Sequence, residues 1–160
     1  MKNIAVYAGT FDPITYGHID LIERAASIFG RIIVAIAANP NKKPLFSLEE
    51  RVSLTTKVLI EYPNVEVSGF DSLLLDFVRQ HDANVILRGL RTVTDFDHEF
   101  QLASMNRHLN PDIESIFLMP AENYMYISSS LVREVALLGG DVTGLVPELI
   151  VKALQDKRRK

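Results

Sequence analysis

The sequence predicts an α/β protein with a doubly wound, five-stranded parallel sheet and helices on both faces. Five short runs of strand-forming apolar residues alternate with segments whose apolar residues recur at helical spacing. The run at 32–38 is apolar throughout, as expected of a parallel strand that is covered on both faces. The chain has 160 residues, the size of one domain, and we expect a single domain over residues 1–160.

The first half of the chain carries signals for three strands and three helices. We expect strands at 4–8, 32–38 and 64–70 and a short third helix around 73–78. The first helix begins near Gly17, and Gly30 is its expected C-terminal cap. After the second strand a polar loop leads into the second helix, which should continue to about residue 61. Ser47 and Glu50 have the spacing of a capping box at its start.

The second half of the chain completes the alternation. We expect strands at 85–87 and 116–119, a loop at 121–127, and a helix at 128–138 closed by Gly139-Gly140. Thr94, with Asp97 three residues later, is the expected N-cap of a long helix that Pro111 ends. Pro147 opens the last helix in its first turn, and the basic residues at 157–160 should form a solvated, frayed tail.

The composition limits the classes of partner. A net charge of −3 argues against broad binding to nucleic acids or anionic membranes, so local cations must meet any anionic ligand. The chain has no cysteine, which excludes disulfides and thiolate chemistry. The longest apolar run is far shorter than the roughly 20 residues that span a bilayer, and Lys2 is not followed by a secretory signal. We expect a cytoplasmic protein.

The segment 9–18 has the features of an anion-binding turn. Gly9 ends a buried strand, Asp12-Pro13 is a turn pair, and Gly17 allows close approach of a ligand to the backbone. The helix that follows directs free N–H groups and its positive dipole end into the turn. His18 lies at this helix start, next to the expected phosphate. The alternative is an ordinary strand-to-helix turn with a solvated histidine.

Two common phosphate motifs are absent, because the chain contains neither a G-x-x-x-x-G-K-[ST] loop nor a G-x-G-x-x-G fingerprint. Instead, Thr15-x-Gly17-His18 and the Ile-Ser-Ser-Ser run at 127–130 resemble the hallmarks of the nucleotidyltransferase superfamily, which has a Rossmann-like fold. The Arg-Gly-Leu-Arg run at 88–91 and the block at 95–107 are similar to those of the phosphopantetheine adenylyltransferases, specifically the bacterial type. The chain departs from that family's pattern at Ala8 and at Asp97-His98.

The resemblance implies transfer of an adenylyl group from ATP to 4′-phosphopantetheine, giving dephospho-CoA and pyrophosphate in coenzyme A biosynthesis. The attacking group is a phosphate that is largely ionised at neutral pH, so direct in-line attack needs no catalytic base and no covalent enzyme intermediate. The resemblance further implies Mg²⁺ carried by ATP rather than by a protein metal site, a homohexamer, and feedback binding of coenzyme A. No nucleic acid or membrane partner is expected.

The resemblance also assigns roles to individual residues. His18, Lys42 and Arg91 are the expected catalytic residues, with His18 donating a hydrogen bond to the α-phosphate. The expected ATP-binding residues are Thr10, Phe11, His18, Gly89, Leu90, Arg91, Glu99, Tyr124, Met125, Tyr126, Ile127, Ser128, Ser129 and Ser130. The expected acceptor-binding residues are Thr10, Lys42, Leu74, Arg88, Met105 and Asn106.

Other interpretations of these residues remain open. Lys42 has the pattern of an exposed loop lysine, with Lys43 as its neighbour, and one of the three serines caps a helix in any reading. Leu74 and Met105 suit core packing equally well. At the level of function, the alternatives are a related nucleotidyltransferase with another phosphate acceptor, and a non-catalytic ATP-binding α/β module.

Overall fold

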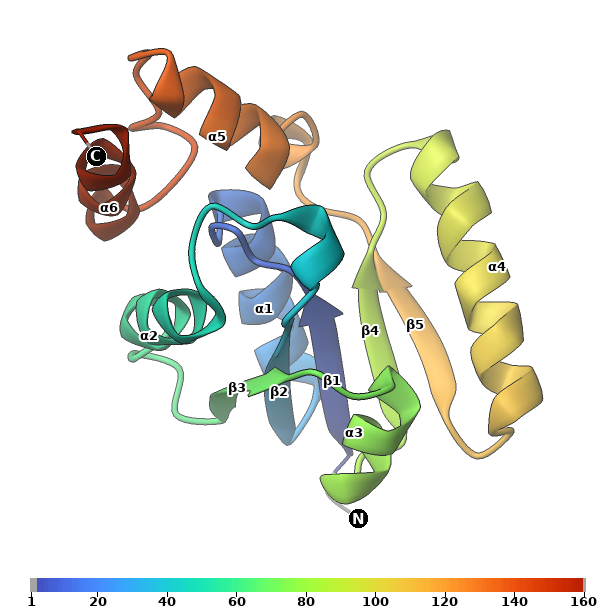
Figure 1. The fold of residues 1–160 in the computed structure, drawn as a ribbon. Helices are drawn as coiled ribbons and strands as arrows, with labels where there is room; N and C mark the ends of the chain where they lie inside the picture. The colour runs from blue at the N-terminus through green and yellow to red at the C-terminus, as the bar shows by residue number, and fades with distance from the viewer. Residues whose placement is uncertain (1–2, 160) are drawn as a thin grey trace.

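The computed structural model describes residues 3–159 and contains one five-stranded parallel sheet (Figure 1). The strands are β1 (Ile4–Gly9), β2 (Arg31–Ala37), β3 (Val65–Phe70), β4 (Val85–Gly89) and β5 (Glu114–Leu118). They lie in the order β3-β2-β1-β4-β5, and all neighbours are parallel. The order reverses at β1, which confirms the predicted doubly wound sheet.

Within residues 3–159, six α-helices connect or follow these strands. They are α1 (Tyr16–Ile28), α2 (Leu48–Val58), α3 (Leu74–Gln80), α4 (Val93–Leu109), α5 (Ser129–Leu137) and α6 (Glu148–Arg159). The two loops that we expected to be irregular each contain a short 3₁₀ helix, Pro40–Lys42 and Glu122–Tyr124. Ser47 caps α2 in the predicted capping box, in which its hydroxyl accepts from the Glu50 N–H and the Glu50 carboxylate accepts from the Ser47 N–H.

Both faces of the sheet are covered. Ala5 and Tyr7 of β1 belong to a buried cluster with residues of α1, α2, α5 and α6. Val6 and Ala8, which point to the opposite side, belong to a second buried cluster with residues of α3. Right-handed crossovers place α4 on the α3 side as well, where it runs beside β5 (Figure 1).

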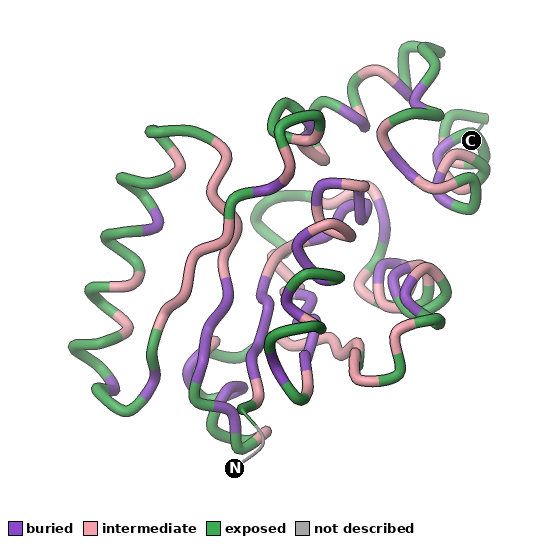
Figure 2. Tube along the Cα trace, turned by 180° about the vertical axis from the view of Figure 1, so that it is seen from behind, coloured by how far each residue is buried: buried purple, intermediate pink, exposed green. Residues whose placement is uncertain are grey.

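Helix α4 is the least buried of the long helices (Figure 2). Of its residues only Glu99 is buried, and Glu99 is acidic rather than apolar. Its exposed apolar side chains are Val93, Phe96, Phe100, Leu102, Met105 and Leu109. An amphipathic helix normally buries its apolar stripe against a neighbour, so this surface is a candidate contact with another molecule.

Two predicted helix ends are wrong. Phe29, in an extended conformation with φ −101° and ψ 146°, caps α1, so Gly30 is not the cap. Thr92 rather than Thr94 caps α4: its hydroxyl accepts a 3.1 Å hydrogen bond from the Asp95 N–H. Thr94 already lies within the first helical turn, because the extended backbone ends at Thr92. The α4 prediction had the correct residue type two positions too late, whereas the cap of α1 is a phenylalanine rather than a glycine.

The C-terminal segment also differs from its prediction. Helix α6 continues to Arg159, and Lys157 is not a solvated tail residue. Its Nζ lies 2.9 and 2.8 Å from the two carboxylate oxygens of Glu50 and 5.3 Å from the centre of the Phe46 ring. These contacts join α6 to α2, so the segment is helical rather than frayed, while Arg158 and Arg159 are exposed as expected. Lys160 lies outside the described residues.

Smaller differences concern the ends of other elements. Helix α2 ends at Val58 with Leu59 as its cap, three residues before the predicted end. Pro147 directly precedes α6, and its carbonyl accepts from the Val151 N–H. Gly139 follows α5 with a φ of +86°, the left-handed conformation predicted for a helix-closing glycine. None of the helices described for residues 3–159 is long and apolar enough to cross a membrane.

Candidate functional site

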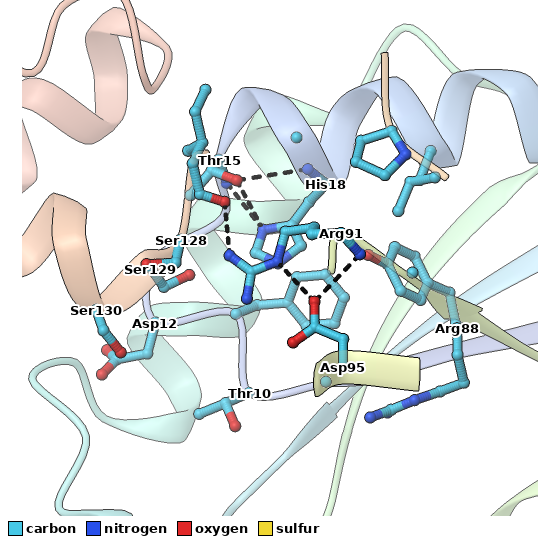
Figure 3. A pocket seen from close by; sticks show the side chains of 18 of the residues that line it. Thr10, Asp12, Thr15, His18, Arg88, Arg91, Asp95, Ser128, Ser129 and Ser130 are labelled. Atoms are coloured by element: carbon cyan, nitrogen blue, oxygen red, sulfur yellow. Dashed lines mark hydrogen bonds and ion pairs between the residues drawn. The ribbon is translucent and has the colours of Figure 1, made fainter. Parts of the chain in front are cut away.

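A cavity of about 350 Å³ opens at the carboxyl ends of β1 and β4. This is the point at which the strand order reverses, where doubly wound sheets bind their ligands. The turn 9–18, the end of β4, the start of α4 and the start of α5 all contribute to its wall. Figure 3 shows the labelled polar side chains of these segments pointing toward a common space.

His18 and Thr15 form a capping box at the start of α1. The Thr15 hydroxyl accepts from the His18 N–H, with 3.4 Å between Oγ1 and N. In return, the His18 Nδ1 accepts a 3.0 Å hydrogen bond from the Thr15 N–H. A histidine therefore takes the place that glutamate usually occupies in this motif. Because Nδ1 accepts a backbone proton, the neutral ring carries its own proton on Nε2.

The surroundings of His18 favour the neutral imidazole. Burial, the larger cause, and the positive charge of Arg91 together lower the pKa of His18 to about 4. The ring packs against Phe11, with 4.8 Å between centroids, and against Tyr7 at 6.3 Å. At neutral pH His18 is thus an uncharged donor whose N–H is held in one orientation. Its protonation state was open from the sequence alone.

Asp12 ties the turn 9–18 to the segment that precedes α2. The Asp12 side chain is 2% exposed, and its two oxygens accept hydrogen bonds of 2.8 and 2.9 Å from the backbone N–H groups of Leu45 and Phe46. The 3₁₀ helix Pro40–Lys42 lies just before this tethered segment in the chain. Lys42 is exposed and lines the cavity, whereas Lys43 does not line it.

Arg51 fixes the backbone of the same region through hydrogen bonds. Its side chain is among the largest fully buried ones, and its guanidinium donates to backbone carbonyls at the ends of β1 and β2 and at the start of α2. The acceptors are Thr10 at 2.8 Å, Ala37 at 2.7 Å, Ala38 at 3.0 Å, Phe46 at 3.1 Å and Ser47 at 3.3 Å. These bonds fix the backbone of Thr10, and Asn39 Nδ2 donates to the Thr10 hydroxyl at 3.0 Å.

Arg88 and Arg91 reach the cavity from the end of β4 and are held by carboxylates of α4. Arg88 makes a two-pronged contact with Glu99, in which Nε and Nη2 lie 2.8 and 2.6 Å from the carboxylate oxygens. Burial lowers the pKa of Arg88, but the hydrogen bond and the charge of Glu99 outweigh this and raise it overall. Arg91 Nε lies 3.4 Å from Asp95 Oδ2, and Arg91 Nη1 donates to the Ile127 carbonyl at 3.0 Å.

The three serines at the start of α5 have different contacts. Ser128 is the N-cap, and its hydroxyl accepts from the Leu131 N–H at 3.1 Å. Ser129 donates to the Pro13 carbonyl at 2.7 Å, which joins α5 to the turn 9–18. Ser130 accepts from Arg133 at 3.3 Å. Figure 3 shows these serines and Asp12 on one side of Arg91, with Arg88 on the other.

Most of the predicted functional residues line this one cavity. Those that do are Thr10, Phe11, His18, Lys42, Arg88, Gly89, Arg91, Glu99, Tyr124, Ile127, Ser128, Ser129 and Ser130. The predicted residues that do not line it are Leu74, Leu90, Met105, Asn106, Met125 and Tyr126. Leu74 packs against the cluster on the α3 face, while Met105 and Tyr126 are 56% and 63% exposed.

The cavity also contains residues that sequence reasoning missed. Arg133 and Tyr7 line it, and neither lies in a recognised motif. Tyr7 is 5% exposed, and burial raises the pKa of its hydroxyl, so the group stays protonated. The position of Arg133, three residues after Ser130 on the predicted helix, was a usable signal, because such residues share a helix face. Tyr7 had the pattern of an ordinary strand residue.

The acidic residues of the cavity are paired with cations. Asp95 and Glu99 contact arginines, and Asp12 accepts from the backbone. Within residues 3–159, no group of three or more histidine, aspartate or glutamate side chains has the arrangement of a metal site. The cavity instead offers cations and N–H donors, which suits a ligand with several phosphates.

Comparisons with known proteins agree with this chemistry. A family model described as cytidylyltransferase-like matches residues 6–135. The chain is 60% identical to a phosphopantetheine adenylyltransferase of Hahella chejuensis over 155 residues, covering 97% of this chain and 96% of that protein. It is 57% identical to a protein of the same name from Nitrosomonas eutropha over 153 residues, covering 96% and 93%.

Solved structures support the fold. The Plasmodium falciparum nicotinic acid mononucleotide adenylyltransferase complexed with NaAD superposes with a TM-score of 0.74 at 18% identity, covering 98% of this chain and 96% of that one. At such low identity the likeness concerns the fold alone, whereas the curated relatives match nearly end to end. The chain therefore belongs to the phosphopantetheine adenylyltransferase family, within the cytidylyltransferase-like nucleotidyltransferases.

Proposed function

We propose that the chain transfers the adenylyl group of ATP to 4′-phosphopantetheine, giving dephospho-CoA and pyrophosphate, as the names of its relatives indicate. The observation that carries this proposal is the convergence of four cations and a neutral histidine on one cavity. The cations are Lys42, Arg88, Arg91 and Arg133. This set suits two phosphate-bearing substrates, which repel each other unless their charge is neutralised.

The reaction is a direct in-line displacement. An oxygen of the phosphopantetheine phosphate attacks the α-phosphorus of ATP, and the bond between that phosphorus and the bridging oxygen to the β-phosphate breaks. Pyrophosphate leaves with the bonding electrons. The nucleophile is ionised at neutral pH, so no proton has to be removed by the protein. The protein's task is to position the two phosphates and to stabilise charge.

His18 is the proposed donor to the α-phosphate. Its Nδ1 is occupied by the Thr15 N–H at 3.0 Å, which leaves the Nε2 proton for a ligand. A neutral donor with fixed orientation stabilises the negative charge that develops on the α-phosphate oxygens. Because it carries no positive charge, it does not form an ion pair with the attacking phosphate. The low pKa of about 4 ensures that this form persists at neutral pH.

The acceptor phosphate is proposed to bind between Thr10, Lys42 and Arg88. Asn39 donates to the Thr10 hydroxyl, so that hydroxyl's own proton is directed elsewhere and is available to a phosphate oxygen. Arg88 keeps N–H groups beyond those bonded to Glu99 and the Ala8 carbonyl. Arg91 and the serines at the start of α5 are proposed to bind ATP, and Mg²⁺ is expected to arrive on the ATP phosphates as part of that substrate.

An acceptor panel tests the reaction. The protein is incubated with MgATP and one of 4′-phosphopantetheine, glycerol phosphate or nicotinate mononucleotide, and pyrophosphate release is measured. We expect release with 4′-phosphopantetheine only. Release with another acceptor alone would support a related nucleotidyltransferase, and ATP binding without release on any acceptor would support a non-catalytic module.

The exposed apolar residues of α4 support a proposed homo-oligomer. Phe96 and Phe100 are 46% and 57% exposed, and their rings lie 5.7 Å apart on the same helix face. A second copy would cover this surface, and we propose the homohexamer of the resembling family. Sedimentation of the full chain tests the assembly.

Coenzyme A shares the pantetheine arm and the adenylate of the product, and it is proposed to compete with the substrates for the same cavity. A cytoplasmic location of the protein is also proposed.

A further inference from the structure

We propose that Asp20 and Arg24 are positioning residues, which clamp the segment 119–121 onto α1 and thereby fix the part of the cavity wall that receives the base of ATP. This inference rests on the proposed function, since it concerns a part of that substrate. Neither side chain lines the cavity, so neither is a catalytic residue. Both belong to α1, where they lie four residues apart on one face of the helix.

The clamp holds the backbone on both sides of Pro120. Asp20 Oδ2 accepts a 3.0 Å hydrogen bond from the Ala121 N–H and a 2.9 Å hydrogen bond from Arg24 Nη2. The same Nη2 donates to the Met119 carbonyl. Pro120 has no N–H of its own to donate, so the two side chains bind both peptide groups that flank it. These contacts join segments about a hundred residues apart in the chain, at separations of 95 and 101 positions.

The segment 119–121 lies beyond the end of the sheet. The Leu90 N–H donates to the Leu118 carbonyl at 2.9 Å, and the segment begins directly after this contact. The Asp20 and Arg24 side chains are 18% and 44% exposed, and an ion pair at such a site adds little to the stability of its own helix. Loss of the clamp should therefore release this segment locally while the fold remains intact.

Ala121 positions the loop that leads from β5 to α5. Its carbonyl accepts a 2.9 Å hydrogen bond from the Tyr124 N–H, which closes the short 3₁₀ helix of this loop. The Tyr124 carbonyl in turn accepts from the Ile127 N–H at 3.1 Å. Pro120, Tyr124 and Ile127 all line the cavity. A displacement of Ala121 would therefore be passed on to the residues that this loop contributes to the cavity wall.

The loop and the start of α1 together form an uncharged part of that wall. A Cβ atom at Gly17 would lie 3.6 Å from the Tyr124 carbonyl oxygen, and the Tyr16 and Tyr124 rings stack with 6.3 Å between centroids. Gly17, Pro120, Tyr124 and Ile127 line the cavity without adding a charged side chain. The base is the planar, uncharged part of ATP, so its chemistry matches this part of the wall.

Binding measurements without an acceptor test the clamp. Calorimetric titrations of AMP, which contains the base, and of Mg-pyrophosphate, which lacks it, are compared for the wild type, Asp20→Ala, Arg24→Met and Arg79→Met. Arg79 is a matched control, because it is a 58% exposed arginine paired with Asp76 on α3, away from the cavity. For both clamp variants we expect about 3- to 30-fold weaker binding of AMP. Pyrophosphate affinity should change by less than about 2-fold.

The pattern of losses separates positioning of the base from a general disturbance. Equal losses for AMP and pyrophosphate would mean that the variants disturb the whole cavity, and unchanged AMP affinity would also overturn the inference. Asp20→Ala and Arg24→Met act on the same segment, so their combination should weaken AMP binding by little more than the stronger single variant. Fully additive losses would show that the two side chains do not act as one clamp.

Hydrogen exchange followed by mass spectrometry gives a readout that does not depend on a ligand. The amides of residues 119–127 should exchange faster in both clamp variants than in the wild type and Arg79→Met, while those of β1 and β2 keep their rates. Unchanged exchange at 119–127, or equally faster exchange throughout the chain, would contradict the clamp. Asp20→Asn keeps an oxygen for the Ala121 N–H but loses the charge that pairs with Arg24. We expect an intermediate effect, and this variant provides the test if Asp20→Ala does not fold.

Failure of the inference and failure of the proposed function are distinguishable. If no acceptor supports pyrophosphate release but the clamp variants lose AMP affinity and exchange faster at 119–127, the reaction is wrong and the clamp stands. If 4′-phosphopantetheine supports release and Asp20→Ala and Arg24→Met bind AMP like the wild type and Arg79→Met, the clamp is wrong and the reaction stands.

Discussion

The turn 9–18 and helix α4 both contribute residues to the wall of the cavity, but different kinds of contact hold the two segments in place. The turn is fixed by buried groups bonded to backbone: Asp12 accepts two N–H groups, and Arg51 donates to five carbonyls. Helix α4 is joined to the cavity through two ion pairs, Arg88 with Glu99 and Arg91 with Asp95, while its apolar side chains are exposed.

This difference separates two kinds of functional group. Backbone bonds from buried residues orient His18 and Thr10 before any ligand arrives, which suits groups whose position determines the rate. Side-chain ion pairs hold Arg88 and Arg91, and a phosphate can share or exchange such contacts. Substitutions on the turn side should therefore affect the rate or the fold strongly. Substitutions on the α4 side should mainly affect substrate binding, of the acceptor through Arg88 and of ATP through Arg91.

The largest effect is expected for His18→Ala. Loss of the oriented Nε2 donor should lower kcat by about 100- to 1000-fold, the range for removing a donor to a developing negative charge. The dissociation constant of ATP should rise far less, because the other phosphate contacts remain. Steady-state kinetics together with an ATP titration check this. A preserved kcat with a raised KM for ATP would show that His18 contributes only to ground-state binding.

Arg51→Met should have the next largest effect, on stability. Its removal leaves the partly buried carbonyls of Thr10, Ala37 and Ala38 without their donor, and we expect the free energy of unfolding to fall by about 3 kcal/mol. Urea unfolding followed by circular dichroism measures this. Arg79→Met serves as the surface control and should change stability by less than about 0.5 kcal/mol. Equal losses in the two variants would refute the structural role of Arg51.

Glu99→Gln should have a moderate effect on the α4 side. The amide keeps the shape of the side chain but removes the charge that orients Arg88, which corresponds to about 1–2 kcal/mol for a charged hydrogen bond. We expect the KM for 4′-phosphopantetheine to rise about tenfold, with a smaller change in the KM for ATP. A larger rise in the KM for ATP would place Arg88 on the nucleotide side instead.

The smallest expected effect is on the titration of His18. With a pKa of about 4, the folded protein keeps this ring neutral between pH 8 and pH 5, whereas an unfolded histidine takes up a proton near pH 6.5. The unfolded state therefore binds more protons in this window, so His18 makes the protein less stable as the pH falls from about 6.5 toward 4. NMR of the His18 ring in the ligand-free protein should show no protonation step near pH 6.5, and such a step would disprove the buried neutral state.

The apolar runs and turn residues were enough to predict the order of strands and helices, because strand and helix periodicities differ and the parallel sheet follows from their alternation. The predictions at Gly30 and Thr94 failed for a local reason. Thr92 and Thr94 are both competent N-caps, and α1 ends before Gly30 with Phe29 in an extended conformation, so residue type alone did not select the end of either helix. The frayed tail failed because the Lys157 contact joins residues far apart in the chain.

The residues of the candidate site likewise fall into those that sequence motifs identified and those that only the structure brought to the cavity. The motifs around His18, Arg88 and Ser128 identified the chemistry, since each motif brings its own residue type to the end of a strand or the start of a helix. Arg133, Tyr7 and Arg51 belong to no motif, and their roles depend on which segments meet at the carboxyl ends of β1 and β4.

The sequence by itself determined the α/β fold class and the family resemblance, and it singled out the turn 9–18 as a candidate phosphate-binding site, because these depend on residues close together in the chain. Only the tertiary structure decided the protonation state of His18, the burial of Arg51 among carbonyls and the presence of Arg133 in the cavity. Burial and electric field at a side chain are set by residues that the fold brings in from elsewhere, such as Arg91 beside His18 and Asp12 beside Arg133.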